Sequence, residues 1–197
     1  MKTLLSDMLS SAIIAGFLQN IIFTGGFGLT ESIRMATKPD KLTRSTGFVA
    51  LFSVCVTVLC RLLDYIPAIQ NSSFVVHAML FTGALALVYA IVFIVLLLLR
   101  TTPLTRKRMS AAALNTLILS LPLISYQSAF SMAQAIGTAV GAAVAYLFAV
   151  ILMHLGLQKL ANNDSIPEIF KGNAAVFIYA AILSLALTGI TGSRISL

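Results

Sequence analysis

The sequence predicts an all-α integral membrane protein with six transmembrane helices in two inverted three-helix repeats and with both termini outside. Three observations carry this prediction: the apolar composition, six long apolar stretches, and the positions of the basic residues between them. Of the 197 residues, 59% are hydrophobic and only 10% are charged, and the mean hydropathy is +1.00. Soluble domains contain about 25% charged residues. So few charges cannot cover a soluble surface, and the chain is therefore expected to lie in a membrane.

Each of the six apolar stretches is close to the roughly 20 residues that a bilayer-crossing helix needs. They cover residues 8–29, 46–66, 73–99, 109–132, 133–157 and 173–190. The first stretch is interrupted early by Asp7 and has no small-residue cleavage site, so it is expected to remain as an uncleaved helix. The fourth and fifth stretches have no polar linker, which predicts a tight turn around residues 131–137. Residues 1–197 are expected to form a single polytopic membrane domain without a separate soluble part.

The basic residues lie in alternate connecting segments and therefore predict an orientation. Segments 31–45, 100–108 and 158–172 together hold 10 of the 13 lysines and arginines. Cytoplasmic loops of membrane proteins carry the excess of Lys and Arg. These three segments are therefore expected in the cytoplasm and both termini outside. This topology also explains the net charge of +7 without nucleic acid as a partner.

Matching irregularities occur in the first apolar stretch of each half of the chain, where the halves are about 8–99 and 109–190. They are Asn20, Gly25, Gly26 and Gly28 in the first half and Asn115 and Pro122 in the second half. Glycine tolerates an unwound backbone, and proline removes an amide hydrogen bond. Helix breaks persist in lipid only where they are buried in protein or line a cavity. Two interpretations stay open: helix breaks around a cavity or ion path, or close packing with interhelical hydrogen bonds.

Three short motifs resemble a known family. The sequence IPEIFKGNA occupies residues 166–174, NIIF at 20–23 leads to GL at 28–29, and RTTP stands at 100–103. These motifs resemble the RnfA/NqrE branch of six-helix membrane subunits from the Rnf and NQR ion-translocating electron-transport complexes. The resemblance implies a homologous six-helix partner, further electron-transport subunits, and a place in the bacterial inner membrane with the N-terminus outside.

The resemblance also implies the positions of an iron–sulfur cluster. In that family each half of the subunit supplies one cysteine to a [2Fe–2S] cluster that is shared with the partner. Those positions correspond to Thr30 and Thr116 in this sequence. Iron in such clusters is held by thiolates, and a protonated threonine hydroxyl is a poor replacement. The cluster is therefore expected to be lost here, and the sequence predicts no cofactor, metal ligand or catalytic residue in this chain.

The only two cysteines, Cys55 and Cys60, do not offer a substitute for the missing ligands. Five residues of helix separate them by about 140° around the helix axis, at roughly 100° per residue. They cannot easily face one metal ion. Both are interpreted as small apolar side chains.

Four ionisable residues in or near the apolar stretches have a structural interpretation. Arg61 and Asp64 are three residues apart, which predicts a local ion pair near the outer end of the second helix rather than a proton relay. His77 and His154 are expected near opposite membrane surfaces. They are therefore interpreted as interfacial anchors and not as a shared metal site.

Small residues gather on one face of the fifth apolar stretch, where Gly137 and Gly141 are four residues apart with alanines between them. Small residues at this spacing let two helix backbones approach closely. The pattern predicts close helix packing, either inside the protein or against a partner subunit.

Three functions stay open from the sequence. The first is a membrane subunit of an Rnf/NQR-like ion-translocating electron-transport complex that lacks its own iron–sulfur ligands. The alternative is a small-solute or ion transporter that uses the same inverted-repeat fold. The third is a purely structural assembly subunit. The sequence contains no P-loop, G-x-S-x-G or H-E-x-x-H motif, so it offers no signature of self-contained hydrolysis or phosphoryl transfer.

Overall fold

The computed structural model describes residues 2–37, 42–165, 167, 171 and 173–191, and within these ranges it contains helices and no strand. The elements in chain order are α1 (Lys2–Ile13), the π-helical turn η1 (Ile14–Leu18), α2 (Ile21–Gly25), α3 (Leu29–Ala36), α4 (Leu42–Leu63), α5 (Pro67–Gln70), α6 (Phe74–Leu98), α7 (Pro103–Ala113), α8 (Thr116–Gln127), α9 (Met132–Ala161) and α10 (Asn173–Thr191). Most of the 166–174 motif, together with Lys38, Lys41 and Arg194, lies outside the described residues.

Four segments are long and apolar enough to cross a membrane: Leu42–Leu63, Phe74–Leu98, Pro103–Gln127 and Met132–Ala161. The all-helical membrane architecture is thereby confirmed at this coarse level. Shorter apolar helices, Leu4–Leu18 and Ala175–Gly189, occupy the places of the first and last predicted spans.

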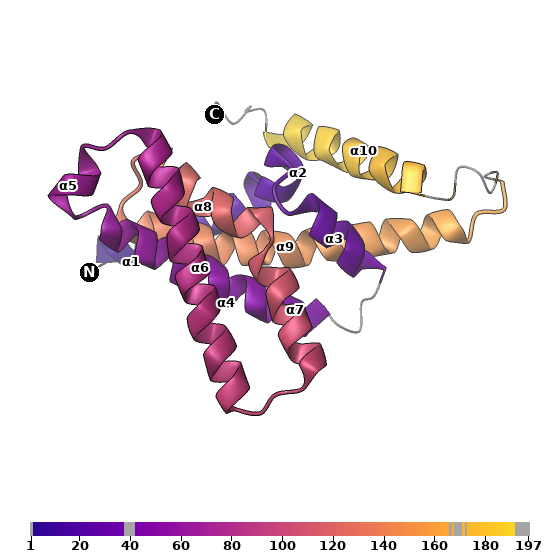
Figure 1. The fold of residues 1–197 in the computed structure, drawn as a ribbon. Coiled ribbons are helices and arrows are strands. Elements are labelled where there is room, and N and C mark those ends of the chain that lie inside the picture. Colours follow the sequence, from indigo (N-terminus) through magenta and orange to yellow (C-terminus); the bar gives the residue numbers. More distant parts are fainter. Residues whose placement is uncertain (1, 38–41, 166, 168–170, 172, 192–197) are drawn as a thin grey trace.

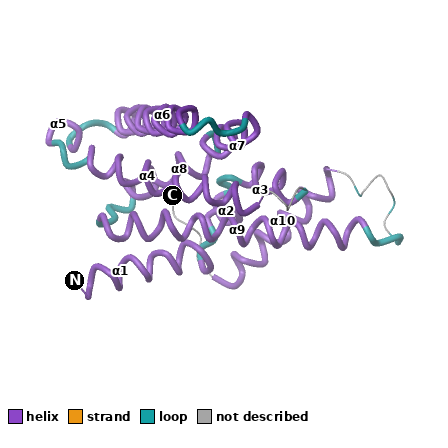
Figure 2. Tube along the Cα trace, turned by 90° about the horizontal axis from the view of Figure 1, so that it is seen from below, coloured by secondary structure: helices purple, strands orange, loops and turns teal. Residues whose placement is uncertain are grey.

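Helix α9 is the centre of the molecule, because it packs against α1, η1, α2, α3, α4, α8 and α10. Figure 1 shows α9 passing through the middle of the ribbon, with α10 alongside it. In Figure 2, α6 and α7 lie on one side of the molecule and α1 lies on the opposite side, with α4, α8 and α9 between them. One apolar core surrounds α9, where Tyr146 is fully buried. A second joins α4, α6, α7 and α8 around Phe52 and Phe81.

The small residues of α9 explain why α1 packs so closely against it. A Cβ atom added to Gly137 would overlap the backbone carbonyl of Met8, and one added to Gly141 would overlap that of Ala12. Only hydrogen at these two positions allows the helices to approach backbone to backbone. The close helix packing predicted for Gly137 and Gly141 is therefore confirmed, and it occurs within the chain.

The first predicted span differs most from the structure. Instead of one helix over residues 8–29, the chain forms α1, widens into η1, breaks before α2, and starts α3 inside the segment 31–45 that was expected to be a loop. Asn20 caps α2, while Gly26 and Gly28 both have a positive φ, so each end of the short helix has a physical cause.

The fourth span and the turn after it also need correction. The span begins at Pro103 rather than near residue 109, because Pro103 is well suited to the first turn of a helix. The turn predicted around residues 131–137 lies earlier, at residues 128–131. The side chain of Ser131 accepts from the amide of Gln134, whose side chain accepts from the amide of Ser131. This capping box starts α9 at Met132.

Candidate functional site

Two interrupted helices form the candidate site, and the same residue type starts the second part of each. Asn20 precedes α2, and its side-chain oxygen accepts a hydrogen bond from the amide of Ile22 at 3.1 Å. Asn115 precedes α8, and its side-chain oxygen accepts from the amide of Leu117, also at 3.1 Å. Both asparagines are buried. Each side chain therefore satisfies a backbone donor that a helix start leaves without a partner inside the membrane.

The amide nitrogens of the two asparagines have different surroundings. Nδ2 of Asn20 donates to the carbonyl of Ala145 in α9 at 3.3 Å. Nδ2 of Asn115 is buried and has no hydrogen-bond partner among the described residues. Asn20 therefore ties its helix break to the central helix, whereas Asn115 leaves a donor unsatisfied beside the other break.

The glycine turn after α2 brings the two interruptions into contact. Gly26 and Gly28 have φ values of +72° and +77°, a region that favours glycine. The amide of Gly28 donates to the hydroxyl of Thr116 at 2.9 Å. A Cβ atom on Gly28 would lie 2.7 Å from Oδ1 of Asn115, so the contact also requires a residue without a side chain. We refer to Gly26, Gly28, Asn115 and Thr116 as the junction.

The two positions that correspond to the family's cluster ligands lie at or beside this junction. Thr116 is the first residue of α8, and Thr30 is the second residue of α3, two residues after Gly28. Both side chains are exposed. The structure thus brings together the neighbourhoods of two residues that are 86 positions apart in the sequence (116 − 30).

The donor atoms at the junction do not fit a [2Fe–2S] cluster. Thr30 and Thr116 present neutral hydroxyls, and Asn115 presents an amide, whereas iron in such clusters requires thiolates. Both cysteines are on α4, where Cys60 is buried in the second apolar core and Cys55 is exposed. Among the described residues there is also no group of three His, Cys, Asp or Glu side chains placed to hold a metal ion.

The remaining predicted break residues have different positions. Gly25 is the last residue of α2, next to the junction. Pro122 does not interrupt its helix, because α8 runs through it to Gln127. A proline removes one backbone donor, and a helix held by packed neighbours can continue past that loss. The fourth span breaks at Asn115 instead.

A second polar site lies where α4 ends. Arg61 donates to Oδ2 of Asp64 at 3.1 Å, which confirms the predicted ion pair. Arg61 also donates to the carbonyl of Phe130, in the turn before α9. Burial raises the pKa of the Asp64 carboxyl, while Arg61 and His77 act to lower it.

His77 also belongs to this second site, and its predicted role as an interfacial anchor is wrong. Its side chain is fully buried, its Nε2 lies 3.6 Å from Oδ1 of Asp64, and its ring stacks on Tyr126. The physical reason is that the first turn of α6 packs against α8 rather than facing the membrane surface. The sequence carried no signal for this contact, because Asp64 and His77 are separated by a turn and by α5.

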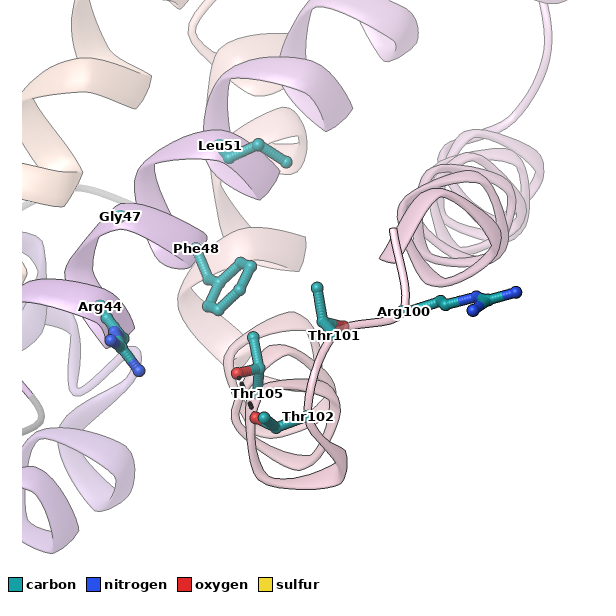
Figure 3. A pocket seen from close by; sticks show the side chains of 8 residues that line it. All are labelled: Arg44, Gly47, Phe48, Leu51, Arg100, Thr101, Thr102 and Thr105. Atoms are coloured by element: carbon teal, nitrogen blue, oxygen red, sulfur yellow. Dashed lines mark hydrogen bonds between the residues drawn. The ribbon is translucent and has the colours of Figure 1, made fainter. Parts of the chain in front are cut away.

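The predicted cytoplasmic segments also meet in the structure. Arg44, at the end of segment 31–45, and Arg100, at the start of segment 100–108, border one pocket of about 580 Å³. Figure 3 shows the two arginines at opposite edges of this pocket, with Phe48 extending toward Thr101 between them. His154 near the end of α9 contacts the carbonyl of Ala36 at 2.7 Å, which joins the end of α3 to the part of α9 that leads into segment 158–172.

Comparison with known proteins gives a consistent result, although no family model matches the chain. The chain is 32% identical over 80 residues, 41% of each protein, to one subunit of the proton-translocating ferredoxin:NAD(+) oxidoreductase complex of Clostridium ljungdahlii. It is 35% identical over 78 residues, 40% of each protein, to the subunit with the same letter in the ion-translocating oxidoreductase complex of Shewanella oneidensis. The chain is similar to this one type of subunit in both complexes.

A third relative is the subunit with the same letter in the Na(+)-translocating ferredoxin:NAD(+) oxidoreductase complex of Acetobacterium woodii, which is 24% identical over 81 residues. The matched region spans about two-fifths of the length of these relatives. Their names confirm the resemblance that the sequence motifs indicated. All three are subunits of multi-subunit ion-translocating oxidoreductase complexes.

Proposed function

We propose that this chain is a membrane subunit of an Rnf/NQR-like ion-translocating electron-transport complex in the bacterial inner membrane. The observation that carries the proposal is the similarity to one type of subunit of such complexes in several bacteria. The junction supports it, because the two positions that correspond to the family's ligands lie at or beside one site formed by two interrupted helices. The other complex subunits, including a homologous six-helix membrane subunit, are the proposed partners.

The proposed topology has six spans in two inverted repeats, with both termini outside. Arg44 and Arg100 border the same pocket, as expected if segments 31–45 and 100–108 lie on one side of the membrane. At the second polar site, Arg61 at the end of α4 reaches the turn between α8 and α9, as expected if those two connections lie on the opposite side. The matched asparagine caps before α2 and α8 support a repeat relationship between the halves.

The proposed subunit has lost the iron–sulfur cluster of its family. Support comes from the hydroxyl and amide groups at the junction and from the position of both cysteines on α4. Thr30 and Thr116 then no longer serve as ligands. Their exposed side chains instead form part of the surface that faces a partner subunit, and electrons in the complex pass through other subunits.

The complex can be isolated from native membranes through an affinity tag on this chain. We expect flavin-binding or iron–sulfur subunits, together with a homologous six-helix subunit, to copurify. Recovery of the tagged chain without any redox subunit, together with solute or ion flux in proteoliposomes that contain only this chain, would instead establish the transporter function.

Iron analysis of the same complex tests the loss of the cluster. The double variant Thr30→Val/Thr116→Val is expected to keep the iron content and visible spectrum of the unmodified complex, because neither hydroxyl binds iron. A matched variant, Ser10→Ala, changes a hydroxyl on α1 that is exposed and bonded only within its own helix. Loss of about two irons per complex in the double variant but not in Ser10→Ala would show that a cluster is held at these positions.

A further inference from the structure

A cavity of about 250 Å³ lies between the end of α4, the start of α6 and the end of α8, at the second polar site. Three side chains that line it each have a buried polar atom without a hydrogen-bond partner: Nε of Arg61, Oδ1 of Asp64 and Nε2 of His77. Unpaired buried polar atoms are costly, so three of them around one cavity indicate that something polar completes the site.

The hydrogen bonds around His77 determine which ring nitrogen carries a proton. Nδ1 lies 3.2 Å from the carbonyl of Ser73 and 3.2 Å from the hydroxyl of Ser72. A carbonyl can only accept, and the Ser72 hydroxyl already donates its proton to the carbonyl of Ile69 at 2.7 Å. Both neighbours therefore require Nδ1 to be the donor, and in a neutral imidazole Nε2 then has a lone pair and no proton.

That lone pair faces a carboxylate. Nε2 of His77 lies 3.6 Å from Oδ1 of Asp64, so two acceptors point at each other inside the protein. The ring cannot simply turn away, because it stacks on Tyr126 with ring centres 4.0 Å apart and meets the edge of Phe81 at 5.9 Å. A proton between the two atoms would convert this repulsive contact into a charge-assisted hydrogen bond.

The other charged and titratable groups around the pair are consistent with the binding of one proton. From α4, Arg61 neutralises Asp64 through its other oxygen at 3.1 Å. The remaining titratable side chains on the cavity are Tyr65 after α4 and Tyr126 on α8. Tyr65 is 66% exposed, so the cavity borders the surface and water can deliver a proton to it.

We propose that His77 and Asp64 form a proton-binding site, in which one proton held between Nε2 and Oδ1 joins the end of α4 to the start of α6. The proton comes from the aqueous phase at the cavity and returns to it, forming and breaking a single N–H bond. The net charge of the three groups is zero without this proton and +1 with it. Because Arg61 also holds the carbonyl of Phe130, the site links α4 and α6 to the turn before α9. The inference stands independently of the proposed function.

Nitrogen NMR of the full chain in lipid nanodiscs, with ¹⁵N-labelled histidine, tests the site directly. The chain contains two histidines, so the variant His154→Gln leaves one signal set, and its amide can still donate to the carbonyl of Ala36. We expect the singly protonated form of His77 to carry its proton on Nδ1. A doubly protonated form is expected to grow as the pH falls.

The variant Asp64→Asn in the same background removes the carboxylate charge. The ratio of doubly to singly protonated His77 at about pH 6.5 is expected to fall about tenfold or more, because a nearby carboxylate favours the charged imidazolium. Asp64→Glu keeps the carboxylate and is expected to restore most of the ratio. The matched control Glu31→Gln removes a carboxylate that pairs with Arg34 on α3, and it is expected to change the ratio less than twofold.

Two results would overturn the proposal. One is a singly protonated His77 with its proton on Nε2, which would make His77 an ordinary donor to Asp64. The other is a ratio in Asp64→Asn equal to that in the Glu31→Gln control. If Asp64→Asn does not fold, the position of the proton in the folded His154→Gln chain still decides the question.

Discussion

The two interrupted helices use the same cap but are held differently. Before α2 and before α8, an asparagine oxygen accepts from the amide two residues ahead, and in each case the bond is 3.1 Å long. The Asn20 amide group then bonds Ala145 in the central helix, whereas the Asn115 amide group has no partner among the described residues. The first break is therefore fixed to the core of the molecule. The second depends on contacts with the glycine turn and retains an unsatisfied donor.

This difference shows that local repetition does not require equal tertiary anchoring. The cap needs only an asparagine at the right position, and both halves of the chain supply one. Anchoring needs an acceptor on a neighbouring helix, and α9 offers the Ala145 carbonyl to one break only. Unsatisfied buried donors are a recurrent feature of functional sites, so the Asn115 side of the junction is the part most suited to bind something from outside the chain.

The largest effect is expected from filling the space between the two breaks. Gly28→Ala places a methyl group 2.7 Å from Oδ1 of Asn115 and also forces alanine into left-handed backbone. We expect a loss of about 2–5 kcal/mol in unfolding free energy, from strain and overpacking together. Thermal unfolding of the chain in nanodiscs measures it.

Gly26→Ala is the matched control for that variant. Gly26 has a similar φ of +72°, but an added Cβ meets no atom within 4 Å. It is expected to cost only the backbone strain, about 1–2 kcal/mol. Equal losses for the two variants would mean that the contact between the breaks contributes nothing.

Removal of the caps is expected to separate the two breaks by a smaller margin. Asn20→Ala loses the cap and leaves the Ala145 carbonyl unpaired, so the expected loss is about 2–4 kcal/mol. Asn115→Ala loses a cap but also removes an unsatisfied donor, and the expected loss is about 1 kcal/mol. Chemical denaturation of both variants measures the difference, and a larger loss for Asn115→Ala would contradict the stronger anchoring of the first break.

The smallest effect concerns the two threonines. Thr116→Val removes the acceptor of the Gly28 amide, and we expect a loss of about 0.5–1.5 kcal/mol. Thr30→Val changes an exposed side chain and is expected to stay within about 0.5 kcal/mol of the unmodified chain. Hydrogen exchange at the Gly28 amide gives a second measurement, since exchange should accelerate in Thr116→Val alone.

The sequence pointed to both helix breaks because asparagine and glycine within an apolar stretch have a local physical meaning. It also located α4, α6 and α10 to within a few residues, since long apolar runs indicate helices by themselves. Pro122 was misjudged as a break because a proline's effect depends on the neighbours that hold its helix. The contact of His77 with Asp64 depends on how α6 packs against α4 and α8, and no spacing in the sequence encodes that packing.

The backbone contact between α1 and α9 has a consequence for how the protein is made. Met8 meets Gly137, a residue that the ribosome adds 129 positions later (137 − 8). At a synthesis rate of roughly 5–20 residues per second, that interval is about 6–26 seconds. During this time the N-terminal helix has reached the membrane without the surface it will finally cover. A chaperone, the insertion machinery or surrounding lipid must occupy that face until the fifth apolar stretch emerges.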